Sequence, residues 1–243
     1  MKLRIGYVSR NLTMTLNSRV SSATLSALAA LVLLHGCASS SAKPKEEPST
    51  AANPLTGMIG RQLLVLPAQY VAVANAGGSW DIVPGAVGLL PILDEEVEDA
   101  FRKRGVKRNW TFAAEITASA NRNAGLAGDP RELGAQGIRR VKAGDTPLPE
   151  PLASQIRGLV ALTNARYALL PLEVRVDTRN SERKASVRML LIDSRTARVA
   201  WAEDVEATTQ RDPQAAADAL TPYGFRLLSR EIAMHFADMV VAQ

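Results

Sequence analysis

Three successive segments near the carboxyl end of the 243-residue chain carry the patterns of β-strands. We expect them at Tyr167 to Val176, Lys184 to Ile192 and Arg198 to Glu206. Apolar and polar residues alternate along the second and third, which is typical of antiparallel strands with one face on a core. The connecting segments are short and polar, so hairpins are the natural connections. These residues therefore commit the chain to an antiparallel meander that other elements must cover.

Apolar residues at helical spacing predict three helices to cover that sheet. They run from about Pro91 to Arg104, from Glu150 to Thr163 and from about Pro222 to Ala242. In the first, acids precede bases along the helix, which suits the helix dipole, and Gly105 stops it. Thr221 is the expected cap of the last helix.

The remaining segments are shorter and more mixed. A continuous apolar run at Arg61 to Leu66 indicates a short buried strand, and Trp110 to Ile116 is a plausible second one. Ala74 to Gly88 is rich in glycine and proline and is expected to be a loop. Asp129 can start a short helix before Gly144 to Pro149, which is expected to form another loop.

These elements predict a single α+β domain over residues 57–243, of a length usual for one domain. In this α/β sandwich, a mixed sheet that includes the carboxyl-terminal antiparallel meander is packed by amphipathic helices.

The order of these elements resembles a known domain. A helix leads through Ala165-Arg166-Tyr167-Ala168-Leu169-Leu170 into a long strand, and a hairpin from Leu190 to Trp201 follows. The pattern is similar to the α/β domain shared by the amino-terminal region of TolB, the curli secretion-channel lipoprotein and the lipoprotein activators of penicillin-binding proteins. Asn164 and Ala197 stand in turns where those families usually carry glycine. The resemblance implies an envelope protein that acts by binding or assembly, with no catalytic residues to carry over.

The only cysteine, Cys37, follows an apolar run and ends the sequence Leu34-His35-Gly36-Cys37. The parts of a secretory signal are present: basic Arg19, about a dozen apolar residues and the small residue Gly36. The four residues that end at Cys37 resemble the recognition sequence (lipobox) of lipoprotein signal peptidase. We expect translation to start at Met14. The alternative is a buried apolar segment with a chance cysteine, but a tether rich in serine, proline, lysine and glutamate follows.

The expected organisation is therefore a signal peptide at 1–36, a lipid-anchored tether at 37–56 and one domain at 57–243. Cys37 would carry lipid such as palmitate, and Ala38 after it indicates the outer membrane, with the domain in the periplasm. The resemblance leaves self-association open, but the segments 70–90 and 110–130 are too irregular to predict a pore.

Removal of the signal changes the charge and the reactive groups of the chain. Four of the 29 basic residues and no acid precede Cys37, which leaves 25 bases against 24 acids. Such a balance makes nucleic acid an unexpected partner. Only His235 remains as a histidine and no free thiol remains, so we expect no disulfide, no histidine–cysteine zinc site and no cofactor.

No sequence motif points to catalysis, and glycine-rich phosphate loops and nucleophile elbows are missing from the sequence. His235 falls on the last helix as a packed or partly exposed residue. The acids of the first helix are better explained by the helix dipole and by pairs such as Glu98 with Arg102 than by a metal site.

Two functions of different classes remain. The preferred one is a non-catalytic outer-membrane lipoprotein that binds or helps assemble an envelope complex, with Trp80, Asp81 and Ile82 as the contact residues because Trp80 would stand on an adaptable loop. Trp80 could instead fold back over the sheet. The alternative function is a periplasmic hydrolase of cell-wall material that uses acids such as Glu203, Asp204 and Glu206, since a glycosidase needs two facing carboxyl groups.

Overall fold

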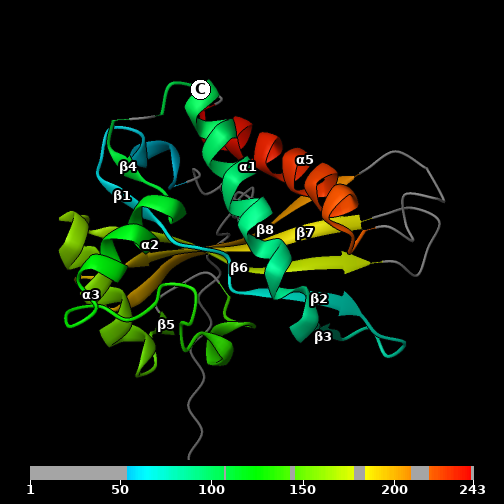
Figure 1. Cartoon of the computed structure of the whole chain (residues 1–243), viewed down its shortest axis with the longest axis horizontal. Coiled ribbons are helices and arrows are strands. Elements are labelled where there is room, and N and C mark those ends of the chain that lie inside the picture. Colours follow the sequence, from blue (N-terminus) through cyan, green and yellow to red (C-terminus); the bar gives the residue numbers. More distant parts are fainter. Residues whose placement is uncertain (1–53, 107, 143–145, 178–183, 209–218, 242–243) are drawn as a thin grey trace, which may run out of the picture. The chain divides into compact units, whose positions relative to one another are not determined.

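The three predicted meander strands form the long centre of a mixed, eight-stranded sheet in the computed structural model of the chain (Figure 1). The model describes residues 54–106, 108–142, 146–177, 184–208 and 219–241. The strands are β1 (Leu63–Val65), β2 (Tyr70–Ala74), β3 (Trp80–Ile82), β4 (Trp110–Thr111), β5 (Thr146–Pro147), β6 (Tyr167–Asp177), β7 (Lys184–Asp193) and β8 (Arg198–Thr208).

The helices confirm the predicted pattern and add to it. The α-helices in the described ranges are α1 (Leu90–Lys103), α2 (Ala113–Arg122), α3 (Leu152–Thr163) and α5 (Pro222–Val241), and the 3-10 turns are η1 (Thr56–Met58), η2 (Pro84–Leu89) and η3 (Gln136–Ile138). The Thr221 hydroxyl accepts the Gly224 N–H at 3.2 Å, so it caps α5 as predicted. None of these helices combines the length and apolar character that crossing a membrane requires.

The sheet has the order β3-β2-β6-β7-β8-β5. The β6-β7 and β7-β8 pairs are antiparallel, as the hairpin interpretation predicts. Along its other edge, β6 pairs in parallel with β1 over its first residues and with β2 over its last. β4 extends the sheet beside β1, and the short strands β3 and β5 stand at the two ends of the main order. The fold is therefore the predicted α+β domain with a mixed sheet.

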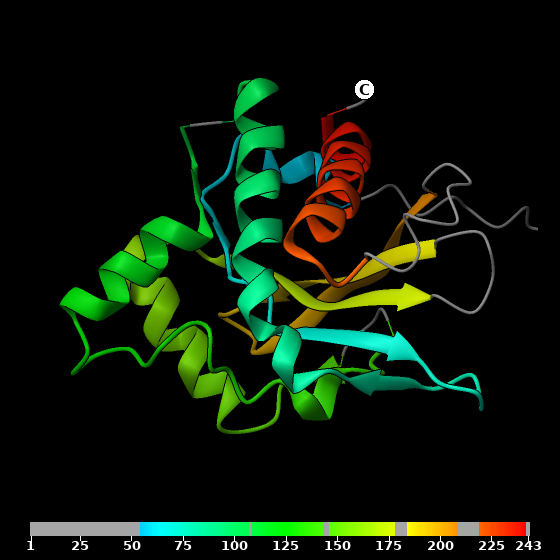
Figure 2. The ribbon, with the colours of Figure 1, turned by 45° about the vertical axis from the view of Figure 1, so that its right-hand side comes forward.

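Helices cover the two faces of the sheet (Figures 1 and 2). The first core lies between one face and α1 with α5, and it includes Leu93, Phe101, Ile232 and Phe236. The second core lies on the other face, where the apolar residues of α2 and α3 pack on the first half of β6. Each face thus has its own apolar layer, which explains the unbroken apolar start of β6.

An aromatic cluster fixes α1 and α5 to the strands beside them. The Phe101 ring is fully buried, and its centroid lies 4.7 Å from that of Trp110 and 5.4 Å from that of Phe236. The contact with Phe236 is edge-to-face, the arrangement that aromatic quadrupoles favour. Phe101 therefore joins α1 to the next element, β4, and to α5 at the other end of the domain sequence.

Two turns contain a residue other than glycine in the left-handed backbone conformation. Asn164 ends α3 with φ of 52°, and Ala197 has φ of 52° in the turn between β7 and β8. Asparagine enters this left-handed region readily, whereas alanine does so at a cost of roughly 1–2 kcal/mol. Both turns therefore require a residue with positive φ, and the surrounding hairpin holds Ala197 in that conformation.

Several short predicted elements were wrong. Ala74 to Gly88 is not one loop, because it contains β3 and most of η2, and the apolar strand β2 precedes it. Of the strand predicted at Trp110 to Ile116, only Trp110–Thr111 forms, and α2 begins at Ala113. The Asp129 carboxylate accepts a hydrogen bond from the N–H of Arg131 at 2.8 Å. This contact closes a turn where a helix was predicted to start.

The described domain begins earlier than residue 57. Leu55 lies within the range predicted as tether, yet its side chain is fully buried in the first core. Cys37 and the predicted signal peptide, like most of the predicted tether, lie outside the described residues. The predicted loop from Gly144 to Pro149 is described only from Thr146, where β5 pairs with β8.

The acids of α1 form ion pairs and structural contacts. Glu98 pairs with Arg102, as predicted, but Asp94 is almost buried. The carboxylate of Asp94 accepts the Ala68 N–H at 2.9 Å and a hydrogen bond from the Arg131 guanidinium at 2.9 Å. Burial outweighs these two contacts and raises the pKa of Asp94 to about 6.

This raised pKa gives a prediction for stability against pH. In the unfolded chain the Asp94 pKa is near 3.8, so between pH 4 and 6 the folded chain binds the proton more tightly. The Asp94 contribution should therefore fall as pH rises through this window, by about 3 kcal/mol in total. We expect Asp94→Asn to remove that slope from urea denaturation curves recorded between pH 4 and 7.

The exposed Asp99 of the same helix supplies the control, since Asp99→Asn should keep the wild-type slope. Parallel profiles of the wild type and Asp94→Asn would contradict the assignment.

Candidate functional site

One half of the second sheet face is polar, and a β-bulge marks where the polar half begins. Leu170 and Leu172 pack in the second core, and the β6-β7 register shifts between Pro171 and Glu173. Beyond the bulge, Val174 turns to the first core. Glu173 and the alternate residues after it therefore occupy the face that α2 and α3 cover elsewhere.

Glu173 lies at the centre of this polar half. Its side chain is 1% exposed, and two arginines bind it. One oxygen accepts from Nε of Arg175 at 2.8 Å, and the other accepts from Nε of Arg139. A buried carboxylate needs such partners, because an unpaired charge in the interior is strongly unfavourable.

Arg139 reaches the site from a segment that is distant in sequence. It directly follows η3, whose Ile138 is buried in the second core and fixes the segment against the sheet. Besides binding Glu173, Arg139 donates through Nη2 to the Trp80 carbonyl at 3.2 Å. Arg139 therefore ties η3 to both β6 and β3.

Arg175 extends the network across the sheet. Its Nη1 donates to Asp204 on β8 at 3.1 Å, and Nη2 reaches the Arg139 carbonyl at 3.5 Å. Arg188 of β7 forms an ion pair with the same Asp204 at 3.2 Å and donates to the Val141 carbonyl. The polar half is thus a connected set of ion pairs from three neighbouring strands and the segment after η3.

Trp80 stands at the edge of this network, on the edge strand β3. The Arg175 guanidinium lies over the Trp80 ring, 5.7 Å from its centroid, within reach of a cation–π contact. The ring is half-buried, so it neither points freely into solvent nor disappears into the core. The prediction of an adaptable loop was wrong for Trp80, which is held by strand pairing with β2.

The other two predicted contact residues lie beside Trp80 but play different parts. Asp81 is exposed and accepts from the Asn75 side-chain amide at 3.0 and 3.1 Å. This contact joins the two arms of the β2-β3 hairpin. Ile82 is half-buried and pairs with Ala72. Of the three residues, Trp80 alone lines the adjoining pocket.

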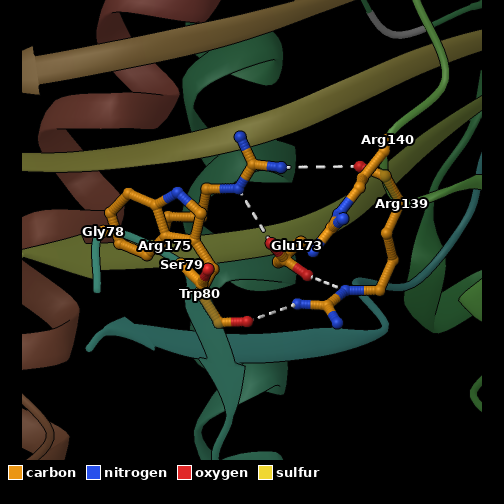
Figure 3. A pocket seen from close by; sticks show the side chains of 7 residues that line it. All are labelled: Gly78, Ser79, Trp80, Arg139, Arg140, Glu173 and Arg175. Carbon is orange, nitrogen blue, oxygen red and sulfur yellow. Dashed lines mark hydrogen bonds and ion pairs between the residues drawn. The ribbon is translucent and has the colours of Figure 1, made fainter. Parts of the chain in front are cut away.

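That pocket has a volume of about 270 Å³ and opens to solvent. Figure 3 shows the side chains of its lining around Glu173. We call it the Trp80 pocket; it is lined by Gly78, Ser79, Trp80, Arg139, Arg140, Glu173 and Arg175. Pockets for drug-sized ligands have volumes of roughly 300 Å³ or more. The Trp80 pocket is smaller, so it suits the end of a side chain or a small group better.

The residues considered for catalysis do not form a catalytic arrangement. His235 is an exposed residue of α5, and Glu203 and Glu206 are exposed on β8. Asp204 is half-buried and forms ion pairs with both Arg175 and Arg188. In the described ranges, no cluster of three or more histidine, cysteine or acidic side chains could hold a metal ion. The arrangement can bind a charged group, and Asp204 takes part in it through its ion pairs with the two arginines.

Glu173, Arg175 and Arg139 were not predicted as site residues from the sequence. A glutamate and an arginine two residues apart inside the otherwise apolar β6 were a usable signal, because a buried strand accepts charges only when they are paired. Arg139 gave no comparable signal, since its partners are set by the packing of η3 on the sheet.

Comparisons with known proteins found similar chains among the solved structures. No family model matches the chain, and no curated protein matches its sequence. The LpoB C-terminal domain from Salmonella enterica is 14% identical, with a TM-score of 0.34 over 65% of this chain and 96% of that one. Lipoprotein GNA1162 from Neisseria meningitidis is 16% identical, with a TM-score of 0.30 over 61% and 80%.

A third solved structure is the PelC dodecamer from Paraburkholderia phytofirmans. It is 14% identical to this chain, with a TM-score of 0.30 over 74% of this chain and 89% of that one. At such identities and TM-scores, a likeness establishes neither a common family nor a common ligand.

Proposed function

We propose that this chain is a non-catalytic lipoprotein of the bacterial outer membrane that binds, or helps assemble, a protein complex of the cell envelope. The observation that carries the binding role is the Trp80 pocket, an open cationic hollow with a half-buried tryptophan in its wall. Tryptophan and arginine are the residues that most often dominate protein–protein binding energy. The neighbouring Asp81 and Ile82 would belong to the same contact surface.

The anchoring role is carried by the sequence before the domain. The apolar run, the box that ends at Cys37 and the polar stretch after it support a lipid anchor joined to a tether. A lipid on Cys37 would hold the domain at the periplasmic side of the outer membrane, where its pocket can meet other envelope proteins.

The experiment compares envelopes that contain the wild-type chain with envelopes that contain Trp80→Ala. After crosslinking and pull-down of the tagged chain, we expect Trp80→Ala to reduce the recovery of a specific partner at least about tenfold, as the loss of a central tryptophan does at other interfaces. Tyr223→Ala is the matched control, because Tyr223 is an aromatic residue of α5 that is 74% exposed.

Identical partner lists for the wild type and Trp80→Ala would sink the assignment of this surface. A third arm, Cys37→Ala, tests the anchor in the same cells, because it should abolish labelling by radioactive palmitate and release the chain from membranes. Retained labelling would refute the anchor, and turnover of peptidoglycan by the purified chain would overturn the non-catalytic assignment.

A further inference from the structure

The charges that line the Trp80 pocket do not balance. Arg139, Arg140 and Arg175 face the pocket, and the only carboxylate in its lining is Glu173. Nearby, Asp204 is matched by the further arginine Arg188 and adds no net negative charge. The lining therefore carries an excess of two positive charges beside a half-buried aromatic ring.

The three arginines differ in how many of their side-chain nitrogens already make a hydrogen bond. Arg175 uses all three of its nitrogens within the network. Arg139 uses Nε and Nη2 but not Nη1. Arg140 is exposed, and its side chain makes no hydrogen bond or ion pair with any residue in the described ranges. Among the described residues, Arg139 and Arg140 thus keep nitrogens without a hydrogen bond, and both line the pocket (Figure 3).

We infer that the Trp80 pocket binds a carboxylate from an acidic segment of the protein partner. This inference rests on the proposed function, because it names the group on the partner that enters the site. In an unmodified protein, the ionised groups that complement arginine are carboxylates, and a guanidinium binds them with two parallel hydrogen bonds. Arg140 supplies the free fork, and the Trp80 ring supplies an apolar surface for the aliphatic part of the acidic side chain.

The network behind the pocket explains why Arg140 would be the residue that responds to the ligand. Glu173 and Asp204 already hold Arg175, so this guanidinium keeps its place whether or not a ligand is bound. Arg140 has no such partner among the described residues, so an entering anion would compensate its charge.

The test uses the full chain in detergent, labelled with 5-fluorotryptophan. Its three tryptophans give three fluorine resonances, and the Trp80→Phe variant identifies the one that reports on the pocket. The probe is the peptide acetyl-Gly-Glu-Gly-amide, and acetyl-Gly-Gln-Gly-amide is its neutral control. We expect a saturable shift of the Trp80 resonance with the glutamate peptide and none with the glutamine peptide.

Arg140→Gln should weaken this binding about tenfold or more, because it removes charge-assisted hydrogen bonds. Arg140→Lys should fall between the wild type and Arg140→Gln, since lysine keeps the charge but not the fork. Arg122 is an exposed arginine of α2, and Arg122→Gln should bind as the wild type does. The inference is overturned by equal shifts with both peptides, by unchanged binding in Arg140→Gln, or by inorganic phosphate that binds more tightly than the glutamate peptide.

Failure of this inference and failure of the proposed function can be told apart. In one outcome, the glutamate peptide fails to bind while Trp80→Ala still loses its partner in crosslinked envelopes. That result supports the proposed contact surface and refutes carboxylate binding in the pocket. If the peptide binds and Arg140→Gln abolishes binding, but Trp80→Ala retains every partner, the pocket recognises carboxylates and the proposed assembly role is wrong.

Discussion

Glu173→Ala is expected to lower the free energy of unfolding by about 3–5 kcal/mol, the range found when one partner of a buried ion pair is removed. The substitution leaves Arg139 and Arg175 without their shared carboxylate, and Arg175 is only 14% exposed. Urea denaturation followed by circular dichroism measures the change. We expect Glu173→Gln to lose less, because the amide oxygen can still accept one of the two hydrogen bonds.

Glu206→Ala is the matched control for this prediction. Glu206 is an exposed acid of β8, and its loss should change stability by less than about 0.5 kcal/mol. If Glu173→Ala lowers the free energy of unfolding no more than Glu206→Ala does, the ion-pair network does not stabilise the polar half of the sheet.

Phe101→Ala is expected to have an effect of similar size for a different reason. The ring contacts Trp110 and Phe236 and is fully buried, so its removal leaves a cavity between α1, α5 and the sheet. Phenylalanine-to-alanine changes in cores destabilise by about 3–5 kcal/mol. Thermal unfolding should show a large fall in the midpoint temperature.

Phe101→Leu separates volume from aromaticity, since it retains much of the apolar contact but loses the edge-to-face geometry with Phe236. Tyr223→Ala again serves as the control, because its ring is mostly in solvent. An equal loss in Phe101→Ala and Tyr223→Ala would contradict the central role of the cluster.

The sequence predicted those elements whose patterns are long. β6, β7 and β8 follow the predicted meander, and α1, α3 and α5 follow helical spacing within a few residues. Shorter elements were missed because tertiary contacts decide them. β2 and β3 form a hairpin whose strands are stable only beside β6, and the glycines at their turn masked the strand pattern.

The site was harder to predict than the fold. Trp80 was predicted to be a contact residue on a loop, whereas it lies on β3 at the edge of the Trp80 pocket. Its real partners, Arg139 and Arg175, lie 59 positions or more away in the chain. The packing of η3 on the sheet brings Arg139 to Trp80, and the pairing of β3 with β2 and of β2 with β6 brings Arg175 there. The glutamate and arginine within β6 marked the place, whereas the bulge before them decides which face of the sheet both occupy.

The two ends of the main strand order have a consequence for how crowded copies behave. β3 has three residues, and the guanidinium of Arg139 donates a hydrogen bond to the carbonyl of its Trp80. β5 has two residues, and one of them is Pro147. Proline and inserted charge both prevent a second sheet from adding to an edge. Each of these short strands therefore offers few unpaired backbone groups to a neighbouring copy, although β5 covers only Arg198 and Val199 of the longer strand β8.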